Sequence, residues 1–130
     1  MKTLVCFCYW IFICLRKNFY LDIVIICFSF DSAQSLKSVA NKWIPEIEQH
    51  CPGVPFFVVA NKTDVEVDQD VKLLLWETGE TVATSNNAKG FFQCSALTKV
   101  GVKKIFVKAA KEVLKKERKH TNFSQKCKVI

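Results

Sequence analysis

Three runs of apolar residues, rich in β-branched and aromatic side chains, recur along the chain and predict three buried strands. The runs lie at 21–30, 54–60 and 91–95. They are apolar at almost every position and do not alternate with polar residues. This pattern is typical of strands that are covered on both faces in a parallel sheet.

Apolar stripes at helical spacing separate these runs and predict helices between them. The first stripe follows Asp31 and Ser32, which offer N-cap chemistry, and Pro45 is expected to kink this helix or to tighten its last turn. A second helix is expected to begin near Asp68. Residues 78–90 are polar and rich in turn residues, and they are expected to lie at the surface.

The third stripe is the most regular in the chain. From Val102 to Leu114 apolar residues recur every three or four positions, lysines fill most of the other face, and the periodicity fades beyond Glu117. Strand and helix thus alternate three times, which predicts an α/β fold, a parallel sheet with flanking helices and right-handed crossovers. Ligands of such sheets bind beyond the carboxyl ends of the strands, so the residues that follow the second and third strands are candidates for a site.

Residues 4–15 form a further apolar run whose structure the pattern leaves open. The run fits a buried strand, which would cover the exposed edge of the strand at 22–29. It fits the core of a signal peptide or an anchor equally well. As a helix it is too short to span a bilayer.

Composition narrows the class of protein. The chain has 130 residues, of which 50% are apolar and 24% charged, as in one globular domain. Its seven cysteines are odd in number and include no CxxC pair, which indicates a reducing compartment. The net charge is +7, and ten Lys or Arg residues lie between residues 103 and 128. Such a segment suits an anionic membrane surface or a solvated helix face, and no nucleic acid is expected because aromatics do not interleave with the lysines.

The second strand ends on the sequence N-K-T-D, which suits the base of guanine. A carboxylate such as Asp64 accepts from N1–H and N2–H₂ of guanine together, and adenine lacks that pair of donors. Asn61 can bond the O6/N7 side or hold the neighbouring loop, and Lys62 can lay its methylene stem across the base. The backbone N–H of Ala96, which follows Ser95, can reach O6. A polar strand-to-helix turn is the plain alternative.

The sequence from Asp22 to Asp64 closely resembles the Rho branch of the Ras-like small GTPases. Residues 91–106 resemble the family's C-S-A-K-T-x-x-G-V segment, with Leu97 at the position of the usual lysine. The resemblance implies an incomplete P-loop GTPase (Ras-like) fold over residues 15–116, made of its last three strands and helices, after a divergent segment 1–14. The segments that carry the resemblance are Asp22–Ser29, Asp31–Leu36, Lys42–Glu46, Cys51–Pro55 and Asn61–Asp64.

The resemblance also implies GTP or GDP as ligand, Mg²⁺ as the family's metal, and Rho-type regulators or effectors as partners. The implied guanine-binding residues are Asn61, Lys62, Asp64, Ser95, Ala96 and Leu97. The chain contains no G-x-x-x-x-G-K-[ST] and no D-x-x-G. The phosphate loop and both switch regions are therefore expected to be missing, with no catalytic residue and no metal ligand to assign. Nucleotide binding is expected to be weak and hydrolysis to be lost.

The last four residues, Cys127-Lys128-Val129-Ile130, match a C-a-a-X box within a basic tail over 117–130. A prenyl group on Cys127 together with the lysines would hold the protein on the cytosolic face of membranes.

Three interpretations of the whole chain follow. The first is a Rho-type small GTP-binding protein in truncated form. The second is a non-catalytic, membrane-tethered remnant that serves as an interaction module. The third is a secretory protein whose signal is the segment 4–15 and whose N-x-[ST] glycosylation sequons begin at Asn61 and Asn122.

Overall fold

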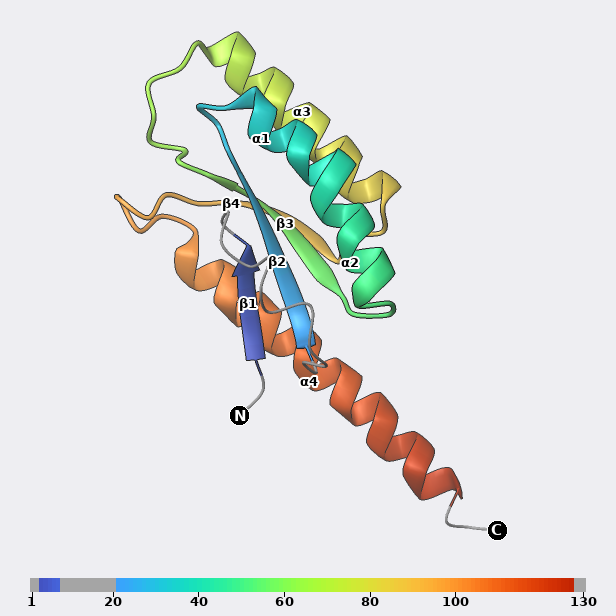
Figure 1. Cartoon of the computed structure of the whole chain (residues 1–130). Helices are drawn as coiled ribbons and strands as arrows, with labels where there is room; N and C mark the ends of the chain where they lie inside the picture. The colour runs from blue at the N-terminus through green and yellow to red at the C-terminus, as the bar shows by residue number, and fades with distance from the viewer. Residues whose placement is uncertain (1–2, 8–20, 128–130) are drawn as a thin grey trace.

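The computed structural model describes residues 3–7 and 21–127, which form one sheet with helices on both faces (Figure 1). All neighbouring strands are parallel, and their order in space follows their order in the chain. The strands are β1 (Thr3–Phe7), β2 (Leu21–Ser29), β3 (Phe56–Asn61) and β4 (Gly90–Gln93). The helices are α1 (Ala33–Ser38), the π-helical η2 (Val39–Trp43), α2 (Ile44–His50), α3 (Gln69–Ser85) and α4 (Val102–Cys127).

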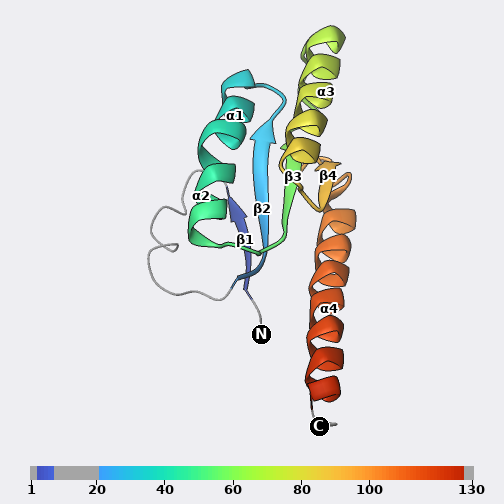
Figure 2. The same ribbon diagram turned by 90° about the vertical axis from the view of Figure 1, so that its right-hand side faces the viewer.

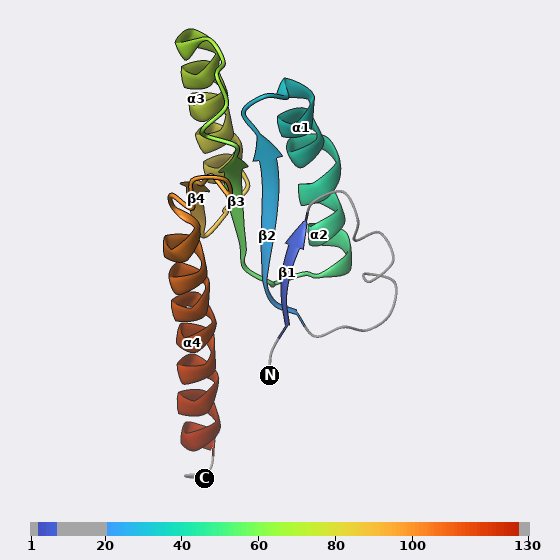
Figure 3. The same ribbon diagram turned by 90° about the vertical axis from the view of Figure 1, so that its left-hand side faces the viewer.

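The sheet is buried on both faces, as the uninterrupted apolar runs predicted. Along β2, the side chains of Val24, Ile26 and Phe28 pack under α1, α2 and α3. The alternating side chains of Ile23 and Ile25 pack under α4 on the opposite face. Figures 2 and 3 show the two helical layers with the sheet between them. The predicted α/β class, a parallel sheet with flanking helices, is confirmed.

β1 lies at the edge of the sheet and pairs with β2. Val5 lies opposite Val24, and Phe7 lies opposite Ile26. For the described part of the segment 4–15, the structure is therefore a strand, and it covers the edge of β2. Residues 8–15 lie outside the described residues.

Of the two effects expected of Pro45, a kink or a tightened last turn, the tightened turn is wrong, because the helix widens there instead. The N–H of Ile44 donates to the carbonyl of Val39, five residues back, which closes the π-helical turn of η2. Pro45 has no N–H for the carbonyl of Asn41, and its ring crowds that carbonyl in a regular α-helix. A π-helical turn directly before the proline relieves this conflict, so α2 continues from η2.

The helix expected near Asp68 runs farther than the sequence indicated, because the polar, turn-rich segment that begins at residue 78 is helical to Ser85. Its start agrees with the sequence, since Asp68 is the N-cap. Leu75, Gly79 and Ala83 are buried at successive four-residue steps, so in the segment after residue 77 small residues line the inner face. On the outer face, threonine hydroxyls donate to carbonyls four residues earlier. The donors are Thr78, Thr81 and Thr84.

α4 packs Ile105 and Ala109 onto the second face of the sheet. It does not end where the periodicity fades at Glu117, and its backbone stays helical to Cys127. Figure 1 shows why the pattern changes, because the last turns of α4 extend past the sheet and have no apolar layer to face.

Candidate functional site

Two loops meet at the carboxyl edge of the sheet, one after β3 and one after β4. Parallel pairing places Ala60 opposite Gln93, so the next residues of both strands leave the sheet side by side. The N–H of Cys94 donates to the carbonyl of Ala60 at 2.9 Å, and the N–H of Thr63 donates to the carbonyl of Cys94 at 3.3 Å. The N-K-T-D and S-A-L segments singled out in the sequence therefore lie next to each other.

Asp64 and Ser95 are joined directly across these loops. Ser95 Oγ donates to Asp64 Oδ1 at 2.5 Å and accepts from the N–H of Thr98 at 3.2 Å. Ser95 is fully buried, whereas Asp64 is exposed. The buried hydroxyl thus fixes a carboxylate at an open edge, and four lone-pair positions on two oxygens leave that carboxylate free to accept further donors.

The loop after β4 presents two of the predicted residues to solvent. The N–H of Ser95 donates to the carbonyl of Val100 at 3.0 Å, which closes the loop. Gly101 follows with φ of +79°, in the left-handed region that favours glycine. Between the ends of the loop, Ala96 is exposed and Leu97 is 80% exposed. The Ala96 backbone and the Asp64 carboxylate therefore border the same open edge.

Asn61 holds the neighbouring loop, which is one of the two roles that the sequence left open. Its side chain is half-buried at the end of β3, and Oδ1 accepts from Cys94 Sγ at 3.0 Å. An amide in this position fixes the spacing of the two loops.

Lys62 is paired with Asp31, a contact that the sequence analysis missed. Lys62 Nζ donates to Asp31 Oδ2 at 2.9 Å, and Ser29 Oγ donates to Asp31 Oδ1. These hydrogen bonds, that from Ser29 first, hold the pKa of Asp31 below its ordinary value of 3.8. Ser32, not Asp31, caps α1. The missed signal was position, because Asp31 lies two residues after the end of β2 and the carboxyl ends of parallel strands share an edge.

The described residues do not fit a Mg²⁺ site. Hard divalent cations need several oxygen ligands. Within residues 3–7 and 21–127 no three His, Cys, Asp or Glu side chains gather in a way that could hold a metal ion. At the carboxyl edge, Asp31 is already bonded to Ser29 and Lys62.

The tail site is described only in part. Cys127 is the last residue of α4, and residues 128–130 of the C-a-a-X box lie outside the described residues. In the part of the chain that the structure describes, no helix combines the length and the apolar character needed to cross a bilayer.

Comparison with known proteins agrees with the motif resemblance. The Ras family model matches residues 12–115. Rho-related GTP-binding protein RhoB of Homo sapiens is 36% identical over 104 residues, covering 73% of this chain and 53% of the relative. The Mus musculus protein of the same name gives the same values. The chain therefore spans about half the length of the curated relatives it matches.

Proposed function

The chain belongs to the Ras family, and from that premise we propose that its carboxyl edge binds the base of a guanine nucleotide. The observation that carries the proposal is the exposed Asp64 carboxylate, held by the buried Ser95 hydroxyl at 2.5 Å. This carboxylate accepts from N1–H and N2–H₂ of guanine, and the N–H of Ala96 is the donor for O6. Adenine carries an amino group in place of O6 and lacks the N2 donor, so it mismatches both contacts.

Contacts to the guanosine part of the nucleotide alone predict a modest affinity for GDP. Guanosine has about 20 non-hydrogen atoms, and at about −0.3 kcal/mol per atom these supply about −6 kcal/mol. That corresponds to a Kd on the order of tens of micromolar. We expect GDP to bind these 130 residues in this range and ADP to show no measurable binding.

Calorimetry with GDP and ADP tests the base contact. Asp64→Ala removes the acceptor pair and should weaken GDP binding more than tenfold, since each charge-assisted bond contributes about 1.5–3 kcal/mol. Glu66→Ala is the matched control, because it removes an exposed carboxylate two residues away. Asp64→Asn presents an N–H in place of one acceptor and should shift preference toward xanthosine diphosphate, whose C2 carries a carbonyl. Equal binding of GDP and ADP, or equal losses in the Asp64→Ala and Glu66→Ala variants, would contradict the proposal.

We further propose that the 130-residue chain does not hydrolyse GTP at a measurable rate. Phosphoryl transfer depends on a phosphate cradle, a metal ion and a positioned nucleophile. The sequence has no G-x-x-x-x-G-K-[ST], and the described side chains hold no metal cluster. In a single-turnover assay, phosphate release should equal the buffer control. Release above that control which survives repurification would overturn this part of the proposal.

The proposed location is the cytosolic face of a membrane, through a prenylated Cys127. A single lipid anchors weakly, and each nearby lysine or arginine adds about 1 kcal/mol at an anionic surface. α4 carries most of these cations, and it extends past the sheet toward the tail (Figure 3).

Fractionation of cells tests the anchor. Cys127→Ser should move the protein to the soluble fraction, Cys51→Ser should not, and high salt should partly release the unsubstituted chain. If Cys127→Ser protein stays in membranes through a carbonate wash, the segment 4–15 is the anchor instead.

A second candidate function is that of a non-catalytic interaction module for Rho-type regulators. Three apolar side chains near the start of α3 favour it, since Val71, Leu73 and Leu74 are 42%, 57% and 63% exposed. Excess chain should then slow nucleotide exchange that a Rho-type exchange factor catalyses on its own substrate, and the double variant Leu73→Asp, Leu74→Asp should abolish the inhibition. No inhibition at micromolar excess would exclude this function.

A further inference from the structure

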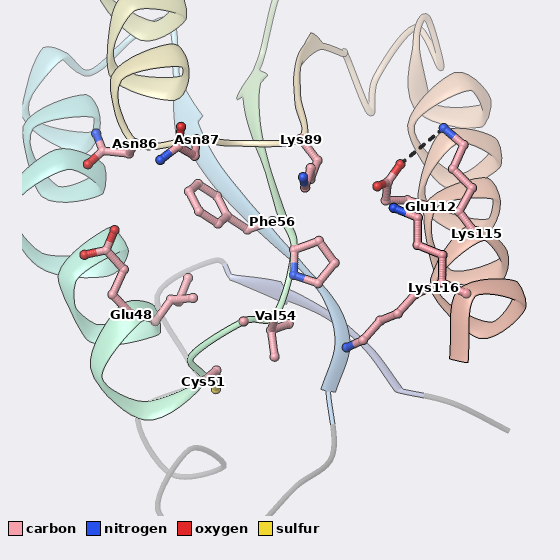
Figure 4. A pocket seen from close by; sticks show the side chains of 14 residues that line it. Glu48, Cys51, Val54, Phe56, Asn86, Asn87, Lys89, Glu112, Lys115 and Lys116 are labelled. Carbon is pink, nitrogen blue, oxygen red and sulfur yellow. Dashed lines mark ion pairs between the residues drawn. The ribbon is translucent and has the colours of Figure 1, made fainter. Parts of the chain in front are cut away.

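A concave surface lies at the end of the sheet opposite to the candidate site. The groove has a volume of about 460 Å³ and opens at the amino end of β3 (Figure 4). It is bounded by the loop that joins α2 to β3, the turn that joins α3 to β4, and one side of α4. Its floor is apolar, with Phe56 only 6% exposed and Val54 half-buried. The volume lies within the range of small-ligand sites.

Cations from two distant parts of the chain converge on this groove. Lys89 comes from the turn before β4, and Lys115, Lys116 and Lys119 come from consecutive turns of α4. The acids that face the groove are Glu48 and Glu112, so its formal charge is +2, from four lysines and two glutamates.

One of these acids is already neutralised. Lys115 Nζ lies 3.7 Å from Glu112 Oε2, as the dashed line in Figure 4 marks. Lys116 instead reaches from α4 toward the strand side of the groove. Within the described residues, the structure gives Lys89, Lys116 and Lys119 no ion-pair partner. With Glu48 these three ammonium groups leave a net charge of +2 around one concave surface, which favours an anion between them.

We propose that this groove binds a compact ligand with two or more phosphate groups, of the inositol polyphosphate class. Each phosphate group presents several acceptor oxygens and up to two charges, and lysine binds phosphate as a point charge. The apolar floor has room for the ring that carries the phosphates. The ligand is either the free polyphosphate or the headgroup of a membrane lipid, and the lipid form rests on the membrane attachment proposed above. The site does not depend on guanine binding, because it uses the other end of the sheet.

Titration of the full 130-residue chain with inositol hexakisphosphate at physiological salt tests the groove. The double variant Lys89→Gln, Lys116→Gln should bind about tenfold more weakly, which is the effect of losing about 1.4 kcal/mol in total from two screened contacts. The matched control, Lys104→Gln, Lys108→Gln, removes the same charge from exposed positions of α4 outside the groove. Lys108 lies about 12 Å along the helix from Lys116, beyond the Debye length of about 8 Å, so the control should change binding less than twofold.

The outcomes separate a site from diffuse attraction. Equal losses of affinity in the two double variants would overturn the proposed groove site and leave only diffuse attraction to a basic helix. The absence of any binding would also overturn the proposal. Asp64→Ala should leave binding of inositol hexakisphosphate unchanged, so failure of the guanine proposal would be visible separately.

Vesicles then identify the source of the phosphates. Phosphatidylcholine vesicles that carry a bisphosphorylated inositol lipid are compared with phosphatidylserine vesicles of equal surface charge. Stronger binding to the inositol lipid, lost in the Lys89→Gln, Lys116→Gln variant, assigns the headgroup. Binding of the soluble polyphosphate alone assigns the free ligand.

Discussion

Replacing Gly101 with alanine tests how the loop that carries Ser95 and Ala96 is held. Gly101 has φ of +79°, and a Cβ there would lie 2.3 Å from the carbonyl oxygen of Gln93. That oxygen belongs to the backbone of the last residue of β4, so it has no rotamer that avoids the contact. Either the loop or the end of β4 must move.

Gly53 offers a matched control, because its φ is also +79° and a Cβ there would meet no atom within 4 Å. At both positions the left-handed backbone costs an L residue about 1–2 kcal/mol. The lower freedom of alanine in the unfolded chain offsets about 0.4–1 kcal/mol of this. Gly53→Ala should therefore lower the free energy of unfolding by about 1 kcal/mol. Gly101→Ala adds a forced displacement of about 1–3 kcal/mol, for a total of about 2–4 kcal/mol.

Urea unfolding followed by circular dichroism measures both free energies. Calorimetry supplies a second readout, because a displaced loop moves Ala96 and should weaken GDP binding in the Gly101→Ala variant only. Equal losses of stability in the two variants would refute the role of the Gln93 carbonyl. Full GDP affinity in a clearly destabilised Gly101→Ala protein would show that the loop stays in place.

Three further predictions follow from local contacts. Gly79→Ala should destabilise the protein by up to about 2 kcal/mol in urea unfolding, because overpacking of about 1–3 kcal/mol against two phenylalanine rings 2.9 Å away outweighs the helix propensity gained, about 1 kcal/mol. Because the folded-state pKa of Asp31 is depressed, its ion pair with Lys62 stabilises the fold above about pH 4, and that contribution is lost as pH falls through the lowered pKa. The Tm of the Asp31→Asn variant between pH 6 and 3 should therefore depend less on pH than the Tm of the unsubstituted chain. Burial raises the pKa of the Cys51 thiol, so iodoacetamide should label Cys51 more slowly in the folded protein than in urea at pH 8, as peptide mass spectrometry would measure.

The strands and the candidate edge could be predicted from the sequence because both follow from simple rules. A strand buried on both faces is apolar at every position, so β2 and β3 stand out without any alternation. Parallel strands end at one edge, so the residues after β3 and β4 had to be neighbours. The hydrogen bond from Ser95 to Asp64 joins these two groups of residues directly.

The missed features depend on side chains that hydrophobicity does not reveal. The inner face of α3 includes Gly79 because the rings of Phe28 in β2 and Phe91 in β4 already fill the space beside it. Lys62 and Asp31 both lie at the carboxyl edge of the sheet, but their place at this edge does not determine which side chains form an ion pair there. The lysine-lined groove is assembled from three segments far apart in the chain, so no local pattern indicates it.

The division of the core between two faces has a consequence for synthesis. Within the described residues, α4 is the one helix that covers the face formed by Ile23, Ile25, Phe57 and Val59. Val59 is synthesised before Ile105, the first buried residue of α4, and the two lie 46 positions apart in the chain. At about 5–20 residues per second that interval lasts about 2–9 s. During this time α3 and β4 are still being made, and the inner face of β2 and β3 lacks the cover of α4. It is an apolar surface that a holding chaperone can bind and that α4 later covers.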